Sequence, residues 1–140
     1  MLSGQNGSKG LKEVRDSNIL IDTDIIIDHL RGIGNFEDLV SDSAKNICHI
    51  SVITIAEIYS LLYFNEYEIV DRMVSHLKVI SVDAIIAKLA GSYRMNYYKS
   101  HQLTIPDAII AASSKINNAL LITKNLKHFP MEDIEKIRPY

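Results

Sequence analysis

Short strand-like runs alternate with longer segments of helical periodicity, and this alternation constrains the fold most strongly. Short, fully apolar strands connected through helices are typical of a parallel sheet that is covered on both faces. We therefore expect an α/β protein built on such a sheet. The expected strands lie near Ile19–Ile21, Ile47–Ile50, Lys78–Ser81 and Ala119–Ile122, with a further short strand near Ile134–Ile137.

The segments between the strands have apolar residues at helical spacing and residues that favour helix starts and ends. Ser51 and Asp83 are predicted to cap helices, and Pro106 is predicted to occupy a first helical position. Gly32 is expected to end the first helix. The predicted helices are Asp24–Arg31, Phe36–Ala44, the run VITIAEIYSLLYF after Ser51, Glu66–Leu77, Ala84–Lys99 and the run DAIIAASSKINN after Pro106.

Length and composition indicate one domain. The 140 residues are 47% hydrophobic, enough for a full core. We expect a single domain over residues 18–140 and a disordered segment over residues 1–17, which begins with the Gly- and Ser-rich MLSGQNGSKG. No apolar run reaches the roughly 18 residues that span a bilayer, and no secretory signal is visible. The one cysteine, Cys48, favours a cytoplasmic location without disulfides.

Charge is unevenly distributed along the chain. Residues 22–87 hold eleven acids and four bases, whereas residues 88–140 hold four acids and eight bases. This asymmetry permits an acidic site beside a basic rim, which suits a reaction on a polyanion. Two ordinary solvated faces would give the same counts, so both interpretations stay open.

The run ILIDTDIII places Asp22 and Asp24 inside an otherwise apolar segment. A buried carboxylate is costly unless it is paired, hydrogen-bonded or bound to a metal. Asp22 lies at the end of one expected strand, and Thr123 and Asn125 lie just past the end of another. Because ligands collect at the carboxyl ends of parallel strands, we expect these residues to share one crevice.

Two further acids interrupt apolar segments. Glu57 is the single charged residue of VITIAEIYSLLYF, and Asp107 begins a helix after Pro106. Taken singly, Glu57 is also compatible with the edge of an apolar face, and Asp107 with an ordinary helix start. Together with Asp22 they would repel unless a cation were bound, and an all-oxygen set suits Mg²⁺ or Mn²⁺. Such a site predicts phosphodiester hydrolysis.

Three segments carry a family resemblance: ILIDTDIIIDHLRG, SVITIAEIYSLL and IPDAIIAASSKINNALLITKNLKHF. In this order they resemble a PIN-domain ribonuclease of the VapC toxin type, over nearly all of the chain from Asn18 onward. The resemblance implies a three-layer α/β/α sandwich, Mg²⁺- or Mn²⁺-dependent cleavage of RNA, and a homodimer. It also implies a cognate antitoxin that blocks the site.

By position, Asp22, Glu57 and Asp107 match the acids of the family. Thr23 matches the small hydroxyl residue that supports the first acid, with Thr123 as a further supporting residue. Asp24 stands where Asn or Ser is more usual, so it either adds an acid or caps its helix.

Many members carry a fourth acid in the segment that reads TKNLKHF here, from Thr123 to Phe129, where no carboxylate occurs. Asn125 is the candidate ligand in its place, through its carbonyl oxygen or a water molecule. His128 stands near a position where some members have an acid. One metal ion or two, and the RNA that is cut, are left undetermined.

Basic residues are the candidates for binding RNA. Lys124 and Lys127 flank the expected crevice, and the resemblance favours Arg94 as a residue facing the substrate. Arg94 lies among Tyr93, Tyr97 and Tyr98, which would either stack on bases or pack in the core or a dimer interface.

Two other functions remain as alternatives. The first is a non-catalytic PIN scaffold that binds RNA or protein. The second is a phosphatase of the haloacid-dehalogenase kind, with Asp22 as nucleophile and Asp24 as acid and base. That superfamily usually has Thr or Val where this chain has Ile26, and no apolar strand leads directly into the late acidic pair Glu132-Asp133.

Overall fold

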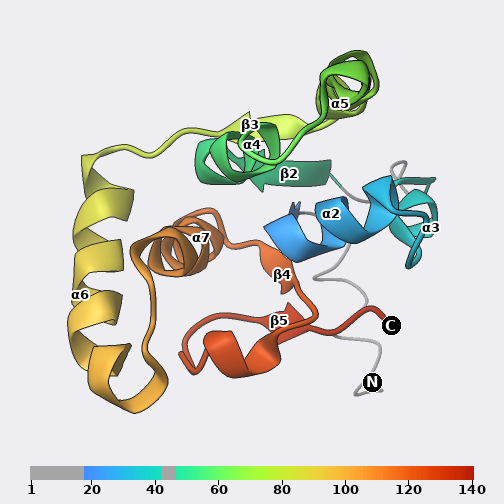
Figure 1. Cartoon of the computed structure of the whole chain (residues 1–140). Coiled ribbons are helices and arrows are strands. Elements are labelled where there is room, and N and C mark those ends of the chain that lie inside the picture. Colours follow the sequence, from blue (N-terminus) through green and yellow to red (C-terminus); the bar gives the residue numbers. More distant parts are fainter. Residues whose placement is uncertain (1–17, 42–46) are drawn as a thin grey trace, which may run out of the picture.

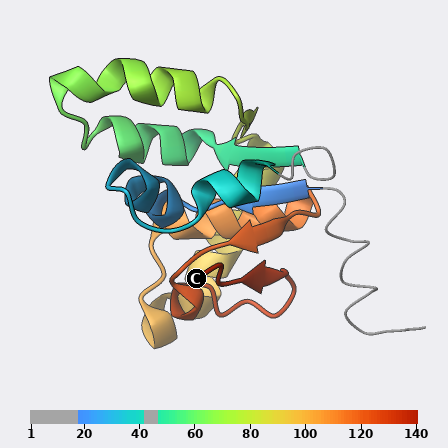
Figure 2. The ribbon, with the colours of Figure 1, turned by 90° about the vertical axis from the view of Figure 1, so that its right-hand side faces the viewer.

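The computed structural model describes residues 18–41 and 47–140, which form a parallel sheet between two layers of helices (Figure 1). The strands are ordered β3-β2-β1-β4-β5, and all neighbouring pairs are parallel. Figure 2 shows β2, β1, β4 and β5 side by side, in this order from top to bottom. The strands are β1 (Asn18–Ile21), β2 (Ile47–Ser51), β3 (Lys78–Ile80), β4 (Leu120–Ile122) and β5 (Lys136–Ile137).

Alternate side chains of β1 face the two helical layers. Leu20 packs in a core cluster with residues of α6 (Ala84–His101) and α7 (Ile105–Ile116). Ile19 and Ile21 pack in a second cluster on the opposite face. The expected α/β/α sandwich is therefore confirmed. The second cluster is covered by α2 (Thr23–Leu30), α3 (Phe36–Ser41), α4 (Val52–Tyr59) and α5 (Tyr67–Val74).

Side-chain caps fix where four helices begin. Ser51 Oγ accepts from Ile53 N at 3.1 Å, and Asp83 Oδ1 accepts from Ile86 N at 2.9 Å, as the sequence predicts. Thr104 caps α7, which begins at Ile105, so Pro106 follows the first helical residue. The cap of α2 is Asp22, so the interpretation of Asp24 as the capping residue is wrong.

Several element boundaries differ from the sequence-based ones. The helix expected over Glu66–Leu77 divides into a 3₁₀ turn, η1 (Phe64–Glu66), and α5. The Glu66 carboxylate accepts from Tyr63 N at 2.9 Å and so closes that turn before α5 begins. A second 3₁₀ turn, η2 (Leu126–His128), follows β4. The disorder predicted for residues 1–17 lies outside the described residues, as does the end of the helix expected up to Ala44.

No helix in the described parts of the chain is both long and apolar enough to cross a membrane.

Candidate active site

Asp22 lies where β1 ends, and the end of β4 meets it there. The Asp22 side chain is only 5% exposed. Its Oδ1 accepts from Thr23 N at 2.7 Å, and its Oδ2 accepts from the Thr123 hydroxyl at 2.8 Å. Asp22 N donates to Ile122 O at 3.0 Å, which continues the pairing of the two strands. Asp22 and Thr123 therefore lie together at the carboxyl ends of β1 and β4, as the sequence predicts.

Thr23 connects this strand end to α4. Its hydroxyl donates to Glu57 Oε1 at 2.7 Å and is also 3.0 Å from the Thr54 hydroxyl oxygen. Glu57 lies in α4 and therefore reaches the residue next to Asp22 instead of pointing only to solvent. The Thr23 hydroxyl therefore holds Glu57, the second acid, and only the backbone N of Thr23 contacts the first acid, Asp22.

Asp107 lies in the first turn of α7 and is partly buried. Burial raises the pKa of its carboxyl, the His128 ring lowers it, and the charge of Glu57 raises it again. Asp107 Oδ2 is 3.7 Å from His128 Nδ1, so the two side chains form an ion pair when the histidine is protonated. Asp107 is therefore close enough to Glu57 for their charges to interact.

The pKa of Asp22 is raised from 3.8 to about 7. Burial is the largest cause, and the charge of Asp24 is the next; Asp107 adds a smaller effect of the same sign. The hydrogen bonds from Thr123 and Thr23 oppose these effects. A buried acid that meets like charges is stabilised in its ionised form by a cation.

Asp24 belongs to the same group of acids. Its Oδ2 accepts from Lys124 N at 3.1 Å and from Asn125 Nδ2 at 2.8 Å. Its Oδ1 is buried and has no hydrogen-bond partner within residues 18–41 and 47–140. Burial also raises the pKa of this carboxyl. An unpartnered buried carboxylate oxygen is costly, and a bound cation would remove that cost.

The residues fit a hard divalent cation by their chemistry. Apart from the Asn125 amide, the candidate donors are carboxylate oxygens, and Asp24 Oδ1 lacks a hydrogen-bond partner among the described residues. Among residues 18–41 and 47–140, no three His, Cys, Asp or Glu side chains already stand in a metal-binding arrangement. Glu57 instead accepts a hydrogen bond from Thr23, and Asp107 lies beside His128. Binding of a metal ion would require the Glu57 and Asp107 side chains to rotate away from these contacts.

A basic hollow of about 180 Å³ lies beside the acids. Sequence reasoning predicted Lys124 and Lys127 here but missed Arg138, whose Nη1 donates to Lys124 O at 2.9 Å. The register of β4 and β5 pairs Ile122 with Ile137, so Arg138 follows opposite Thr123. That pairing is not visible in the sequence. The hollow is lined by Lys124, Asn125, Leu126, Lys127, His128 and Arg138.

Two predicted RNA-binding residues are engaged within the chain. The Lys124 ammonium forms an ion pair with Asp28, whose carboxylate also accepts from the Tyr140 hydroxyl at 2.8 Å. Arg94 Nε donates to Leu103 O at 2.6 Å, and its guanidinium lies 4.3 Å from the centre of the Tyr98 ring. Arg94 thus ties α6 to the turn before α7.

Two tyrosines of α6 differ in whether they pack in the core or remain exposed and able to stack on a base. Tyr93 is buried, and its hydroxyl donates to Asp133 at 2.9 Å, so it is a core residue. Tyr98 is 52% exposed under the Arg94 guanidinium.

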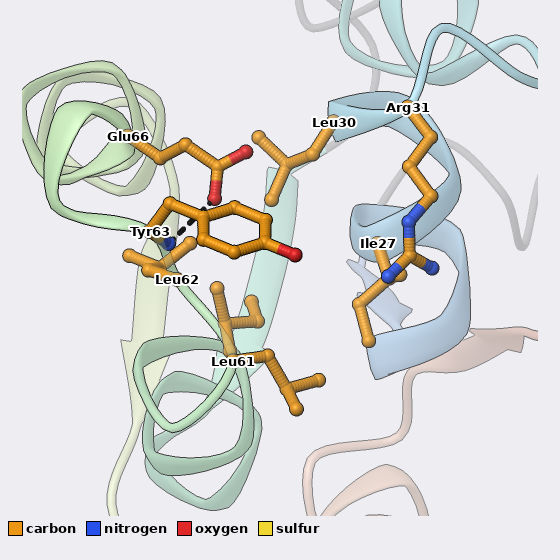
Figure 3. Close-up of a pocket in the computed structure, with 8 residues that line it drawn as sticks. Ile27, Leu30, Arg31, Leu61, Leu62, Tyr63 and Glu66 are labelled. Carbon is orange, nitrogen blue, oxygen red and sulfur yellow. Dashed lines mark hydrogen bonds between the residues drawn. The ribbon is translucent and has the colours of Figure 1, made fainter.

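A second surface feature lies away from the acids. The ends of α2 and α4 and the segment before η1 enclose a small pocket of about 50 Å³ (Figure 3). Arg31 lies on one side of it and Glu66 on the other, and aliphatic side chains line the rest. Of the lining residues, Leu61 is 58% exposed and Tyr63 76%; Phe64, next in the chain, is 93% exposed. We call these three residues, with Ile27 and Leu30 of the pocket, the apolar face.

Comparison with known families identifies the class of protein that this fold and this acidic crevice represent. The model of the family described as "PIN domain" matches residues 19–131. The chain therefore belongs to the PIN-domain family, and the resemblance noted in its sequence is confirmed.

The curated relatives are of the VapC type. Over 123 residues the chain is 34% identical to the Mycobacterium tuberculosis protein "Ribonuclease VapC10", covering 86% of this chain and 91% of the relative. It is 31% identical to "Ribonuclease VapC19" of the same organism, over 80% of this chain and 92% of the relative.

Solved structures agree with the fold. A "Toxin-antitoxin complex from Klebsiella pneumoniae" matches with a TM-score of 0.67 and 28% identity, over 87% of this chain and 98% of the other. A DNA-bound VapBC structure from Salmonella typhimurium has a TM-score of 0.74 at 21% identity, over 88% and 98% of the two chains, and supports the fold alone.

Proposed function

We propose that this chain is a metal-dependent endoribonuclease of the toxin type, which hydrolyses RNA with a Mg²⁺ or Mn²⁺ ion held by Asp22, Glu57 and Asp107. The main support is the proximity of these acids at one end of the sheet: Glu57 in α4 bonds to Thr23 beside Asp22, and the charge of Asp107 in α7 acts on Asp22. The relatives named ribonucleases supply the reaction class. The proposed products carry a 5′-phosphate and a 3′-hydroxyl.

The chain's own residues have distinct roles in this proposal. The carboxylates of Asp22, Glu57 and Asp107 bind the ion, which supplies an activated water and neutralises charge on the phosphoryl oxygen. The Thr23 hydroxyl holds the Glu57 carboxylate in place, and the Thr123 hydroxyl holds that of Asp22. The side chains of the basic hollow attract the phosphate backbone, and electrostatic attraction of this kind depends on salt.

The proposal predicts that RNA cleavage requires a divalent ion. The purified chain, stripped with EDTA, should leave a mixed RNA substrate intact and should cut it once Mg²⁺ or Mn²⁺ is restored. Electrophoresis with end-group analysis of the fragments measures both the cleavage and the product ends. Equal cleavage with and without EDTA would contradict the proposal.

The proposed partner is an antitoxin that docks on the apolar face. The similar solved structure from Klebsiella pneumoniae is a toxin–antitoxin complex. A pocket flanked by Arg31 and Glu66, with exposed Leu61 and Tyr63 in its lining and Phe64 next in the chain, suits an apolar protein segment with charges at its edge.

The docking prediction is tested with Leu61→Asp. A charge placed at the centre of an apolar contact should weaken binding of the antitoxin by about tenfold or more. The ligand is the purified product of a small reading frame adjacent to the gene, and the measurement is its dissociation constant by calorimetry. Ile85→Asp is the matched control, since Ile85 is 63% exposed on α6. Equal affinities for both variants would contradict this docking site.

The remaining expectations stay predictions. They are a homodimer, a cytoplasmic location, and an RNA substrate whose identity no feature of the chain specifies. The non-catalytic scaffold would be favoured by the absence of both metal binding and cleavage. The phosphatase alternative is rejected, because the chain belongs to the PIN family and because Asp133 of its late acidic pair accepts from Tyr93.

A further inference from the structure

We propose that Asp24 supplies the fourth carboxylate of the metal site and that Asn125 is the residue that positions it. This inference rests on the proposed function. It develops one of the two roles that the sequence leaves open for Asp24, that of an added acid, and it gives Asn125, the candidate ligand there, a supporting role. The segment after β4 lacks an acid, and the structure offers a carboxylate from α2 at the same place.

The two oxygens of Asp24 have different surroundings. Oδ2 accepts two hydrogen bonds from the segment after β4, from Lys124 N at 3.1 Å and from Asn125 Nδ2 at 2.8 Å. Oδ1 is buried and has no partner among the described residues. One oxygen is therefore fixed while the other remains available. This is how a metal-binding carboxylate is commonly held by its neighbours.

Asn125 is itself fixed in the position that this role requires. Its backbone N donates to Thr123 Oγ1 at 3.0 Å, and the same Thr123 hydroxyl donates to Asp22 Oδ2 at 2.8 Å. A short chain of hydrogen bonds thus runs from Asp22 through Thr123 and Asn125 to Asp24. Because the Asn125 amide nitrogen points at Asp24, this residue acts on the site through Asp24.

Lys124 does not neutralise Asp24 by direct contact. Its ammonium is paired with Asp28, one turn further along α2, and lies 5.6 Å from the centre of the Tyr140 ring. Only the backbone N of Lys124 donates a hydrogen bond to Asp24, although the charge of the ammonium also lowers the pKa of that carboxyl. No ion pair between Lys124 and Asp24 has to be broken for a cation to bind. Asp28, already paired, is an acid of the same helix that the inference leaves out of the site.

The inference predicts that the carboxylate and the amide can be swapped between positions 24 and 125. Asp24→Asn should weaken Mn²⁺ binding by about tenfold to a hundredfold, and Asn125→Ala by about tenfold. The double variant Asp24→Asn/Asn125→Asp keeps one carboxylate and one amide in contact, so it should recover most of the lost affinity. The measurement is the Mn²⁺ dissociation constant by isothermal titration calorimetry on the full chain stripped with EDTA.

Asp71→Asn, on α5, is the matched control and should bind Mn²⁺ within about twofold of the unaltered chain, because Asp71 accepts from the Tyr59 hydroxyl. If Asp24 only fastened α2 to the segment after β4, Asp24→Asn would lower the thermal midpoint without changing Mn²⁺ affinity. That result would overturn the inference, as would a double variant no better than Asp24→Asn. If Asp24→Asn fails to fold, the Mn²⁺ affinities of Asn125→Ala and of the double variant still test the inference.

The proposed function is tested separately in the same titrations. If the unaltered chain binds Mn²⁺, Asp22→Asn does not, and Asp24→Asn binds normally, the inference fails while the proposed function stands. If the unaltered chain binds no Mn²⁺, both are overturned.

Discussion

Replacing Asp22 by Asn is expected to abolish RNA cleavage while leaving the fold intact. Asp22 is the acid at the junction of β1, β4 and α2, and its two oxygens are held by Thr23 N and Thr123 Oγ1. The amide has nearly the same shape but lacks the negative charge that a cation requires. We expect the cleavage rate at saturating Mg²⁺ to fall by about a hundredfold or more, the loss typical when a group that stabilises charge at the reacting centre is removed.

The measurement is initial cleavage rate on one RNA substrate, with circular dichroism to verify folding. Asp71→Asn is the control of identical chemistry, and it should retain most of the activity, because Asp71 lies on α5 and accepts from the Tyr59 hydroxyl. Undiminished cleavage by Asp22→Asn would reject Asp22 as a catalytic residue.

The same buried acid predicts an unusual dependence of stability on pH. The pKa of Asp22 is raised from 3.8 to about 7, so the folded chain holds this proton more tightly than the unfolded chain. The contribution of Asp22 to stability is therefore fully present below about pH 4 and is lost as the pH rises through 7. Since one pKa unit corresponds to about 1.4 kcal/mol, the loss is at most about 4 kcal/mol.

Urea unfolding of the metal-free chain at pH 5 and pH 8 measures this effect. The Asp22→Asn variant removes the titrating group, so the fall in its free energy of unfolding between pH 5 and pH 8 should be smaller by about 3 kcal/mol, the part of the loss that lies above pH 5. At pH 8 the variant should be the more stable protein, even though it is inactive. If the free energy of unfolding of the two proteins fell equally between pH 5 and pH 8, the raised pKa of Asp22 would be contradicted.

Much of the fold could be predicted from the sequence, because its signals are local. The runs around Ile19–Ile21 and Leu120–Ile122 are apolar on both faces, and only a covered parallel sheet satisfies them. Ser51 and Asp83 are capping residues at helix starts, and both cap as predicted. The division of the expected Glu66–Leu77 helix could not be foreseen, since it depends on the bond between Glu66 and Tyr63 N.

The site was predictable only in part, for a physical reason. Asp22 and Glu57 could be identified as candidate site residues because they are charged residues inside apolar segments. The parallel sheet then predicts that Asp22 and Thr123 lie together at the ends of their strands. The Asp24–Asn125 contact joins residues 101 positions apart and depends on the register of β1 and β4. Likewise, Arg138 enters the basic hollow only because β5 pairs with β4. No local pattern encodes either pairing.

The most direct test is a crystal structure of the chain soaked with Mn²⁺, with the ion located by its anomalous scattering. The account predicts a peak at the carboxyl end of β1, roughly 2.0–2.3 Å from carboxylate oxygens of Asp22 and at least one of Glu57 and Asp107. No peak there at a saturating Mn²⁺ concentration, or a peak bound by other residues alone, would contradict it.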